Sequence, residues 1–188
     1  ECKLPITHLN LNGSTCPDLS PCLGLPIRSI VLDVSPNQDF RQISGIPLQE
    51  LMLRGPHLDT IKTLEGFQLR SLSLDSAPIA DISPLRKMSS LEVIALRDCK
   101  VDSLDALREL RNLDSLILQK TRVRSLHDLK GVPLRSLELR ENPIDDFKPV
   151  LEIQGLEAVV QNDVSRSPRN VAGVPVPFES EMLRLIQA

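Results

Sequence analysis

The 188-residue chain repeats a short apolar phrase every 21 or 22 residues, and this period restricts its fold more than any other feature. The phrase reads apolar-x-x-apolar-x-Leu. Its copies begin at Ile6, Ile27, Leu48, Leu69, Leu91, Leu113 and Leu134, and a degenerate eighth copy begins at Leu156. A fixed period of this length is typical of a solenoid, in which successive repeats stack on one another. Residues that share a position in successive repeats should therefore form columns along the stack.

The columns support this alignment. When the first apolar residue of each copy is position 0, positions 3, 5, 13, 16 and 19 are apolar in all seven complete copies, and position 5 is always Leu. Position 10 is apolar except at Asn37. Alternation over positions 0 to 6 suits a strand whose two faces point opposite ways. Each repeat is therefore expected to add one strand to a parallel sheet.

The second half of each repeat carries helix-start signals. Position 12 holds a residue that can cap a helix in every complete copy: Asp18, Asp39, Thr60, Asp81, Ser103, Ser125 and Asp146. Pro21, Pro84 and Pro149 follow three residues later, where a missing N–H group costs little. These signals predict a short helix or 3₁₀ turn on the outer side of each repeat.

Two phrases carry a resemblance to a known family. Asp18-Leu-Ser-Pro21, Asp81-Ile-Ser-Pro84 and the looser Asp146-Phe-Lys-Pro149 resemble the D-[IL]-S-P-L phrase of bacterial 22-residue leucine-rich repeats, as in internalins. Gly24-Leu-Pro26, Gly45-Ile-Pro47-Leu and Lys130-Gly-Val-Pro133-Leu resemble a phrase of repeat arrays attached to membrane-anchored bacterial Ser/Thr kinase-like proteins. The resemblance implies an α/β repeat solenoid: a right-handed superhelix with one parallel, concave β-sheet and short 3₁₀ or α turns on its convex side.

The expected organisation has two parts. Residues 1–162 form a solenoid of about eight repeats, of which residues 1–5 are an N-terminal cap region. Residues 163–188 form a C-terminal loop and a capping helix, because Phe178, Met182, Leu185 and Ile186 fall at helical spacing. Terminal repeats of a solenoid need such caps, since they would otherwise expose their core.

Position 8 predicts an irregularity inside the stack. In leucine-rich repeats this position usually bears a side chain that forms hydrogen bonds along the stack, as Thr121 and Asn142 could do here. Pro56 and Ala77 cannot form such bonds, so the ladder should be interrupted in the third and fourth repeats. Either water fills the gap or the backbone differs there. The second repeat also carries an unusual turn over residues 34–38.

The cysteines bear on the cellular compartment. Cys99 falls in the position 8 column and is expected to be a buried thiol. Cys2 and Cys22 would lie one repeat apart, and the family resemblance, more than their spacing, favours a disulfide between them. Such a bridge would imply an oxidising compartment. The alternative is that Cys2, Cys16 and Cys22 are reduced and replace apolar residues in a cytosolic core.

Enzyme and nucleic-acid functions find no support. The chain has no phosphate-binding glycine loop, no nucleophile elbow, no metal-ligand spacing and no cofactor motif. His8, His57 and His127 fall in different repeats and columns, so they should not converge. A formal net charge of −3 argues against nucleic acid, and no apolar run has membrane-spanning length.

A protein or peptide partner on the concave sheet face is the remaining expectation. Candidate contact residues at positions 4 and 6 are Val31, Met52, Arg54, Asp75, Ala95, Arg97, Ile117, Gln119, Glu138 and Arg140. Val31, Met52, Ala95 and Ile117 would form an apolar stripe that the core does not require. The charges have a second interpretation, because neighbours of opposite sign on adjacent strands can pair with each other.

This self-pairing interpretation is favoured for Asp33, Arg54 and Asp75, which alternate in sign along the stack. Arg97, Gln119 and Arg140 are better candidates for a partner, although Glu138 could pair with Arg140. The sequence thus predicts a non-enzymatic binding module, expected to be the extracytoplasmic part of a larger bacterial protein. The alternatives are a cytoplasmic scaffold or regulatory subunit for a kinase or phosphatase, and a structural spacer.

Overall fold

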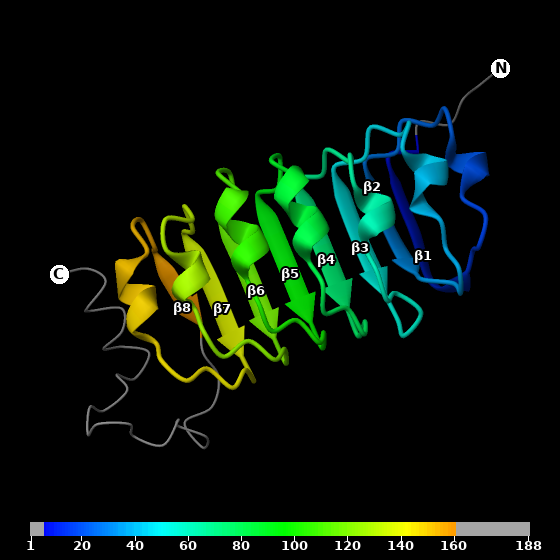
Figure 1. The fold of residues 1–188 in the computed structure, drawn as a ribbon. Helices are drawn as coiled ribbons and strands as arrows, with labels where there is room; N and C mark the ends of the chain where they lie inside the picture. Colours follow the sequence, from blue (N-terminus) through cyan, green and yellow to red (C-terminus); the bar gives the residue numbers. More distant parts are fainter. Residues whose placement is uncertain (1–5, 161–188) are drawn as a thin grey trace.

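In the computed structural model, the described residues are 6–160, and they form a single stack of repeats (Figure 1). The strands are β1 (His8–Thr15), β2 (Ser29–Asp33), β3 (Glu50–Arg54), β4 (Ser71–Asp75), β5 (Val93–Arg97), β6 (Ser115–Gln119), β7 (Ser136–Arg140) and β8 (Ala158–Val160). Between them lie the 3₁₀ turns η1 (Ser20–Cys22), η2 (Phe40–Ile43), η3 (Lys62–Leu64), η4 (Ser83–Lys87), η5 (Asp105–Glu109), η6 (His127–Leu129) and η7 (Lys148–Glu152). The predicted capping helix and Cys2 lie outside the described residues.

The strands form one parallel sheet in sequence order, from β1 to β8. Position 5 stays in register from strand to strand, since Leu53 pairs with Leu74 and Leu74 with Leu96. Only the β1–β2 pair shows a register shift, which falls between Leu11 and Thr15. The prediction of one parallel strand per repeat is therefore confirmed, and the fold class is an α/β leucine-rich-repeat-type solenoid.

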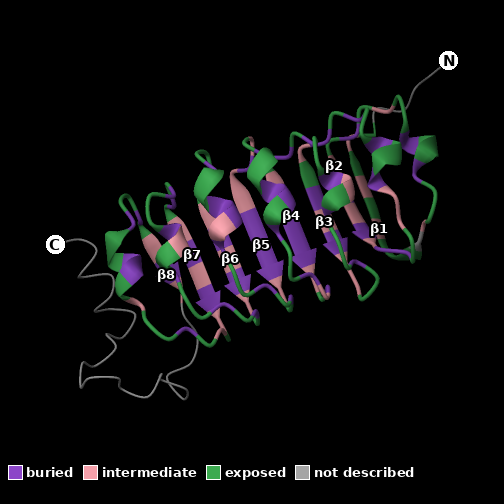
Figure 2. Cartoon of the chain, in the orientation of Figure 1, coloured by how far each residue is buried: buried purple, intermediate pink, exposed green. Residues whose placement is uncertain are grey.

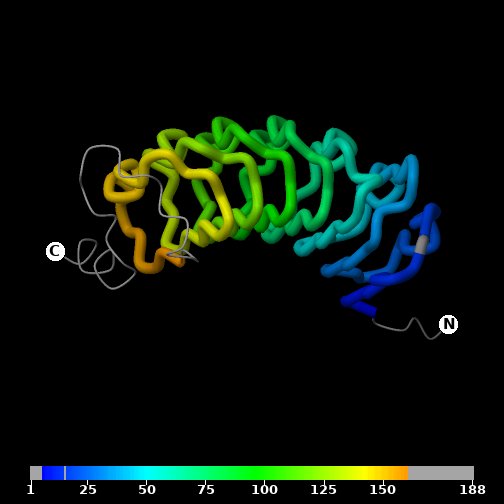
Figure 3. The backbone as a smooth tube through the Cα atoms, turned by 90° about the horizontal axis from the view of Figure 1, so that it is seen from below, coloured from blue at the N-terminus to red at the C-terminus, as the bar shows by residue number. Residues whose placement is uncertain are grey.

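The stack bends into an arc (Figure 3), and the 3₁₀ turns all lie on one side of the sheet (Figure 1). The sheet follows the inner side of the arc and the turns follow the outer side. Within the described residues every outer segment is a 3₁₀ turn of three to five residues, and none is an α-helix. A repeat of 21 or 22 residues leaves room for only this short outer segment once the strand and two loops are placed.

The core fills the space between the sheet and the turns (Figure 2). The position 5 residues Leu32, Leu53, Leu74, Leu96 and Leu118 are fully buried. Phe40, Ile61 and Leu104, all at position 13, close the core from the outer side with at most 1% exposure. The apolar columns read from the sequence are therefore the core. At about 1.5–3 kcal/mol for each buried aliphatic side chain, they supply the main stabilising term of the fold.

The position 12 side chains accept backbone hydrogen bonds at the start of the outer turns, but only Asp39 is itself the N-cap; the N-caps of η4 and η7 are Ile82 and Phe147, one residue later. Asp39 Oδ1 accepts a hydrogen bond from Arg41 N at 2.9 Å, and Asp81 Oδ1 accepts one from Ser83 N at 2.8 Å. Asp146 makes the same contact with Lys148 N at 2.9 Å. These bonds favour the ionised carboxylate. The pKa of Asp81 lies below its usual range because of the hydrogen bonds from Ser83.

The turn after each of the strands β3 to β7 relies on a left-handed residue at position 7. Ser76, Asp98, Lys120 and Glu141 have φ between 50° and 54°, and Gly55 has φ 108°. The backbone N–H groups of this column still donate to the next strand, for example from Ser76 N to Arg97 O at 2.9 Å. The sheet ladder thus runs one residue past the strands before the chain turns outward.

Position 8 shows the predicted interruption. Asn142 forms hydrogen bonds within its own repeat and to the preceding one, whereas the side chains of Pro56 and Ala77 can form none. Ser76, beside Ala77, keeps the same φ as the later repeats, so the backbone turn is unchanged there, whereas Gly55, beside Pro56, has a larger φ. The second repeat departs more strongly: it turns at Asn37, whose φ is 61°.

Candidate binding face

The inner face of the arc carries the side chains of positions 2, 4 and 6. The pairing register places the position 4 residues in one row across the sheet: Val31, Met52, Ser73, Ala95, Ile117 and Glu138. Val31, Met52 and Ile117 are half-buried, whereas Ser73 and Ala95 are only 7% and 4% exposed. The structure thus brings the four predicted apolar residues into one row, with Ser73 interrupting the stripe at its centre.

In the first half of the position 6 row, the charged side chains are already bound by other groups of the protein. Arg54 Nε lies 3.5 Å from Asp75 Oδ2, and Arg54 Nη1 donates to Asn12 Oδ1 at 3.3 Å. Asp33 does not pair with Arg54; its Oδ2 accepts a hydrogen bond from Gly13 N at 2.7 Å. Self-pairing is therefore confirmed for Arg54 and Asp75, while Asp33 serves to hold the irregular end of β1.

The second half of the row is more open. Arg140 Nε lies 2.9 Å from Glu138 Oε1, which confirms the pair considered from the sequence. Gln119 Nε2 donates to Glu141 Oε1 at 3.3 Å. Arg97 differs from both: Nη1 donates to Ser73 Oγ at 3.2 Å, and no carboxylate within residues 6–160 forms an ion pair with it.

Ion pairs between neighbouring repeats cover the outer surface. Lys87 Nζ lies 2.9 Å from Glu65 Oε2, and Lys130 Nζ lies 2.9 Å from Glu152 Oε2. Arg108 joins the fifth repeat to Asp128 of the sixth at 2.6 Å. Each pair is at least partly exposed to solvent and contributes at most about 1 kcal/mol.

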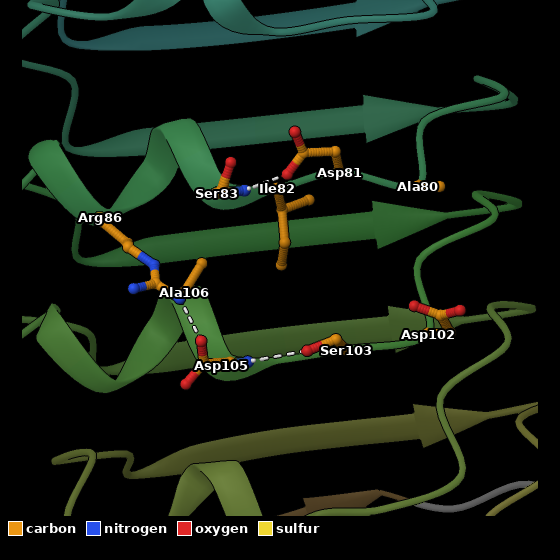
Figure 4. Close-up of a pocket in the computed structure, with 9 residues that line it drawn as sticks. All are labelled: Ala80, Asp81, Ile82, Ser83, Arg86, Asp102, Ser103, Asp105 and Ala106. Atoms are coloured by element: carbon orange, nitrogen blue, oxygen red, sulfur yellow. Dashed lines mark hydrogen bonds and ion pairs between the residues drawn. The ribbon is translucent and has the colours of Figure 1, made fainter.

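A shallow hollow of about 330 Å³ lies on the outer side between η4 and η5 (Figure 4). Most of its polar side chains are already engaged: Arg86 pairs with Asp105, and Asp81 accepts from Ser83 N, whereas Asp102 has no hydrogen bond or ion pair within residues 6–160. No group of His, Cys, Asp and Glu in the described part of the chain is arranged to hold a metal ion. The hollow is a seam between two neighbouring outer turns.

The histidines lie in different repeats and columns, as the sequence indicated. His8 is in β1, His57 follows β3 and His127 begins η6. Cys22 is buried at the end of η1 and forms no disulfide with another residue of the described range. Since Cys2 lies outside that range, the predicted bridge stays a prediction.

Cys99 is a buried thiol, as expected from its column. It is 3% exposed, and Sγ lies 3.3 Å from Arg97 O and 3.7 Å from Leu74 O. Burial raises the pKa of this thiol to about 11. The Cys99 side chain is therefore neutral at physiological pH and poorly nucleophilic.

Solved structures share this architecture. Internalin C2 from Listeria monocytogenes aligns with a TM-score of 0.69 and 25% identity, over 82% of this chain and 70% of the internalin. Internalin F of the same bacterium aligns with a TM-score of 0.68 and 21% identity, over 84% of this chain and 54% of that chain. The fold is that of a leucine-rich repeat protein. The resemblance seen in the repeat phrases is thereby confirmed.

Other comparisons of the leucine-rich repeat array extend beyond bacteria. The ectodomain of the plant receptor kinase GASSHO1/SCHENGEN3 from Arabidopsis thaliana, in complex with CASPARIAN STRIP INTEGRITY FACTOR 2, aligns with a TM-score of 0.60 and 18% identity, over 82% of this chain and 21% of that chain. Cilia- and flagella-associated protein 410 from Mus musculus is 39% identical over 98 residues, which is 50% of this chain and 39% of the mouse protein. No family model matches the sequence.

The matched segment thus spans less than half of the mouse relative. Within residues 6–160, no helix is long and apolar enough to cross a membrane.

Proposed function

We propose that the array is a non-enzymatic module that binds a protein or peptide on its inner sheet face. The observation that carries this proposal is the position 4 row, where Met52 and Ile117 leave apolar surface on the inner face that the core does not need. Apolar and aromatic contacts flanked by arginine are common at the centre of protein interfaces. A leucine-rich repeat neighbour also supports it, since the plant receptor ectodomain forms a complex with CASPARIAN STRIP INTEGRITY FACTOR 2.

The outer surface is a poorer candidate for the same role. Several of its lysines and arginines are paired with carboxylates of the adjacent repeat, as in Lys87–Glu65 and Lys130–Glu152. A partner there would have to replace these contacts, and the exposed apolar side chains of the outer turns, Leu23 beside η1 and Leu151 in η7, lie at opposite ends of the stack and form no common patch. The inner face offers burial without this loss.

A photo-cross-linking experiment tests the assignment of the face. A photoreactive phenylalanine analogue is placed at Met52 or Ile117 on the inner face, and at the exposed Lys62 or Arg111 on the outer side as matched controls. We expect one discrete cross-linked species from both inner positions in cells, and none from the controls. Cross-links from the outer positions alone would reject the inner face as the binding surface.

The proposed location is outside the cytoplasm, as part of a larger bacterial protein. The similarity to two Listeria internalins supports this location. Similarity to the mouse cilia- and flagella-associated protein instead favours the second candidate, an intracellular scaffold. Intact mass after alkylation, with and without reductant, separates them. Protection of Cys2 and Cys22 only without reductant supports export, whereas alkylation of all four cysteines after denaturation supports the scaffold.

A further inference from the structure

Arg97 differs from the other cations of the described chain. Within residues 6–160, seven lysines and arginines have no carboxylate within 4.0 Å: Arg28, Lys62, Arg97, Lys100, Arg111, Arg122 and Lys148. The other six are exposed, so water solvates their charge. Arg97 is half-buried, and it alone of the seven lies on the inner sheet face. No guanidinium nitrogen of Arg97 is both buried and unpaired within residues 6–160, so its free donors are open to solvent on this face.

The nearest carboxylate on the same row is already engaged. Asp75 is the register partner of Arg97 on β4, but Oδ2 lies 3.5 Å from Arg54 Nε, and Oδ1 accepts a hydrogen bond from Ser76 Oγ at 3.1 Å. The Arg97 side chain instead reaches back to Ser73 Oγ at 3.2 Å. That hydroxyl uses one donor of a guanidinium fork that can hold both oxygens of a carboxylate. Arg97 is thus positioned on the face with most of its donors unused by residues 6–160.

The surroundings of Arg97 suit a chain that lies flat on the sheet. Ser73 and Ala95 are small and nearly buried, so they do not project from the centre of the face. Ile117 lies one strand further on, and its Cα is about 8 Å from that of Arg97 by sheet geometry. Side chains on the same side of an extended segment are spaced about 7 Å apart, a similar distance. An acidic and an aliphatic residue two positions apart could therefore contact Arg97 and Ile117 together.

We propose that Arg97 anchors a side-chain carboxylate of an extended partner segment that places an aliphatic residue on Ile117. This inference rests on the proposed function, and it adds the chemistry of the partner. Asp75 on β4, Asp98 just after β5 and Glu138 on β7 are each already paired with a cation, so this face lacks the basic stripe that a polyanion such as nucleic acid requires. A single carboxylate needs only the one guanidinium fork. Charge-assisted bonds of this kind change affinity by about 10- to 100-fold.

A random peptide library tests the proposal without a known partner. Twelve-residue peptides are displayed with their C-termini joined to the phage coat protein, so only side chains supply carboxylates. The peptides selected on wild-type protein are synthesised with amidated C-termini. Their affinities are measured for wild type, Arg97→Gln, Ile117→Glu and the matched control Arg122→Gln, whose side chain is exposed and unpaired within residues 6–160. Thermal unfolding checks that each variant is folded.

We expect selected peptides with Asp or Glu two positions from an aliphatic residue. Arg97→Gln should weaken them about 10- to 100-fold and Arg122→Gln less than twofold. Changing the peptide acid to its amide should weaken binding to wild type but not further to Arg97→Gln. Arg97→Lys keeps the charge but not the guanidinium fork, so its peptide affinity should lie between those of wild type and Arg97→Gln. If Arg97→Gln fails to fold, wild-type affinity from Arg97→Lys would overturn the anchor.

The remaining outcomes separate this inference from the proposed function. Peptides that lose affinity for Ile117→Glu but bind Arg97→Gln as well as wild type would overturn the carboxylate anchor and leave the binding face intact. Failure to enrich any peptide, or equal affinity for wild type and Ile117→Glu, would count against the inner face itself and therefore against both.

Discussion

Removing the Asn142 amide should show how much the position 8 ladder contributes to stability. Nδ2 donates to Leu118 O at 2.8 Å and to Arg140 O at 2.9 Å. Oδ1 accepts from Thr121 N at 2.9 Å and from Thr121 Oγ1 at 2.6 Å. Both amide hydrogens and both acceptor lone pairs are thus used. Asn142 therefore links the sixth and seventh repeats with its full hydrogen-bonding capacity.

Asn142→Ala loses these four bonds. At about 0.5–1.5 kcal/mol each, the sum is about 2–6 kcal/mol. Because Asn142 is only half-buried, water can replace some of the lost hydrogen bonds. We therefore expect the free energy of unfolding to fall by about 3 kcal/mol. Cys99→Ala is the matched comparison in the same column: it removes two longer sulfur contacts, of 3.3 and 3.7 Å, and one small side chain, so it should cost less.

Urea unfolding followed by circular dichroism measures both variants against wild type. The midpoint should fall while the slope m stays constant, and the Asn142→Ala melting temperature should drop by about 6–12 °C. A loss below about 1 kcal/mol, or a larger loss for Cys99→Ala than for Asn142→Ala, would refute the ladder argument.

Three further perturbations test the local structure. Gly55→Ala should lower the free energy of unfolding by about 1–2 kcal/mol in the same urea assay, because a φ of 108° strains any residue with a side chain. The cost comes from the backbone alone, since no atom lies within 4 Å of the new Cβ. An unchanged urea midpoint would contradict this prediction. The pKa of Cys99 is raised to about 11 from an ordinary 9.0, so the folded state holds the thiol proton more tightly than the unfolded state does. The stability that this gives is complete below pH 9 and is lost as the pH rises to about 11. Wild type should therefore lose stability over this window and Cys99→Ala should lose less, and parallel stability profiles of the two proteins would refute the assignment. The Asp81 carboxyl should titrate by NMR with a pKa below 3.8, because the hydrogen bonds from Ser83 stabilise the carboxylate. The stability that these bonds give is present above pH 3.8 and is lost on acidification. At neutral pH, Asp81→Ala should melt at a lower temperature than Asp81→Asn, which keeps a hydrogen-bond acceptor, and equal melting temperatures would argue against the cap.

The sequence predicts the backbone of this protein well because every repeat carries the same pattern of apolar positions. A single apolar column is weak evidence, but seven copies of Leu at position 5 leave one alignment, and that alignment sets the pairing of Leu53 with Leu74 and Leu74 with Leu96. The acids at position 12 likewise predict where the outer turns begin, as Asp39 and Asp81 show. The sequence does not decide between an α and a 3₁₀ turn, since the same capping residues can begin either kind of turn.

Side-chain pairing on the inner face is less predictable. The sequence places Asp33 beside Arg54, yet Asp33 accepts a hydrogen bond from Gly13 N, a contact that depends on the irregular end of β1. The preference of Arg97 for Ser73 depends equally on the rotamers of Asp75 and Arg54. Columns fix which residues share a face, but contacts among long flexible side chains are decided by small energy differences.

The affinity of a cross-linked and then purified partner tests the central claim most directly. It is measured for wild type, for Ile117→Glu on the inner face and for Lys62→Glu on the outer side. The account predicts a loss of about 30-fold or more for Ile117→Glu, because a charge would replace a buried apolar contact, and an unchanged affinity for Lys62→Glu. Equal affinities for Ile117→Glu and wild type, or a loss confined to Lys62→Glu, would contradict binding on the inner face.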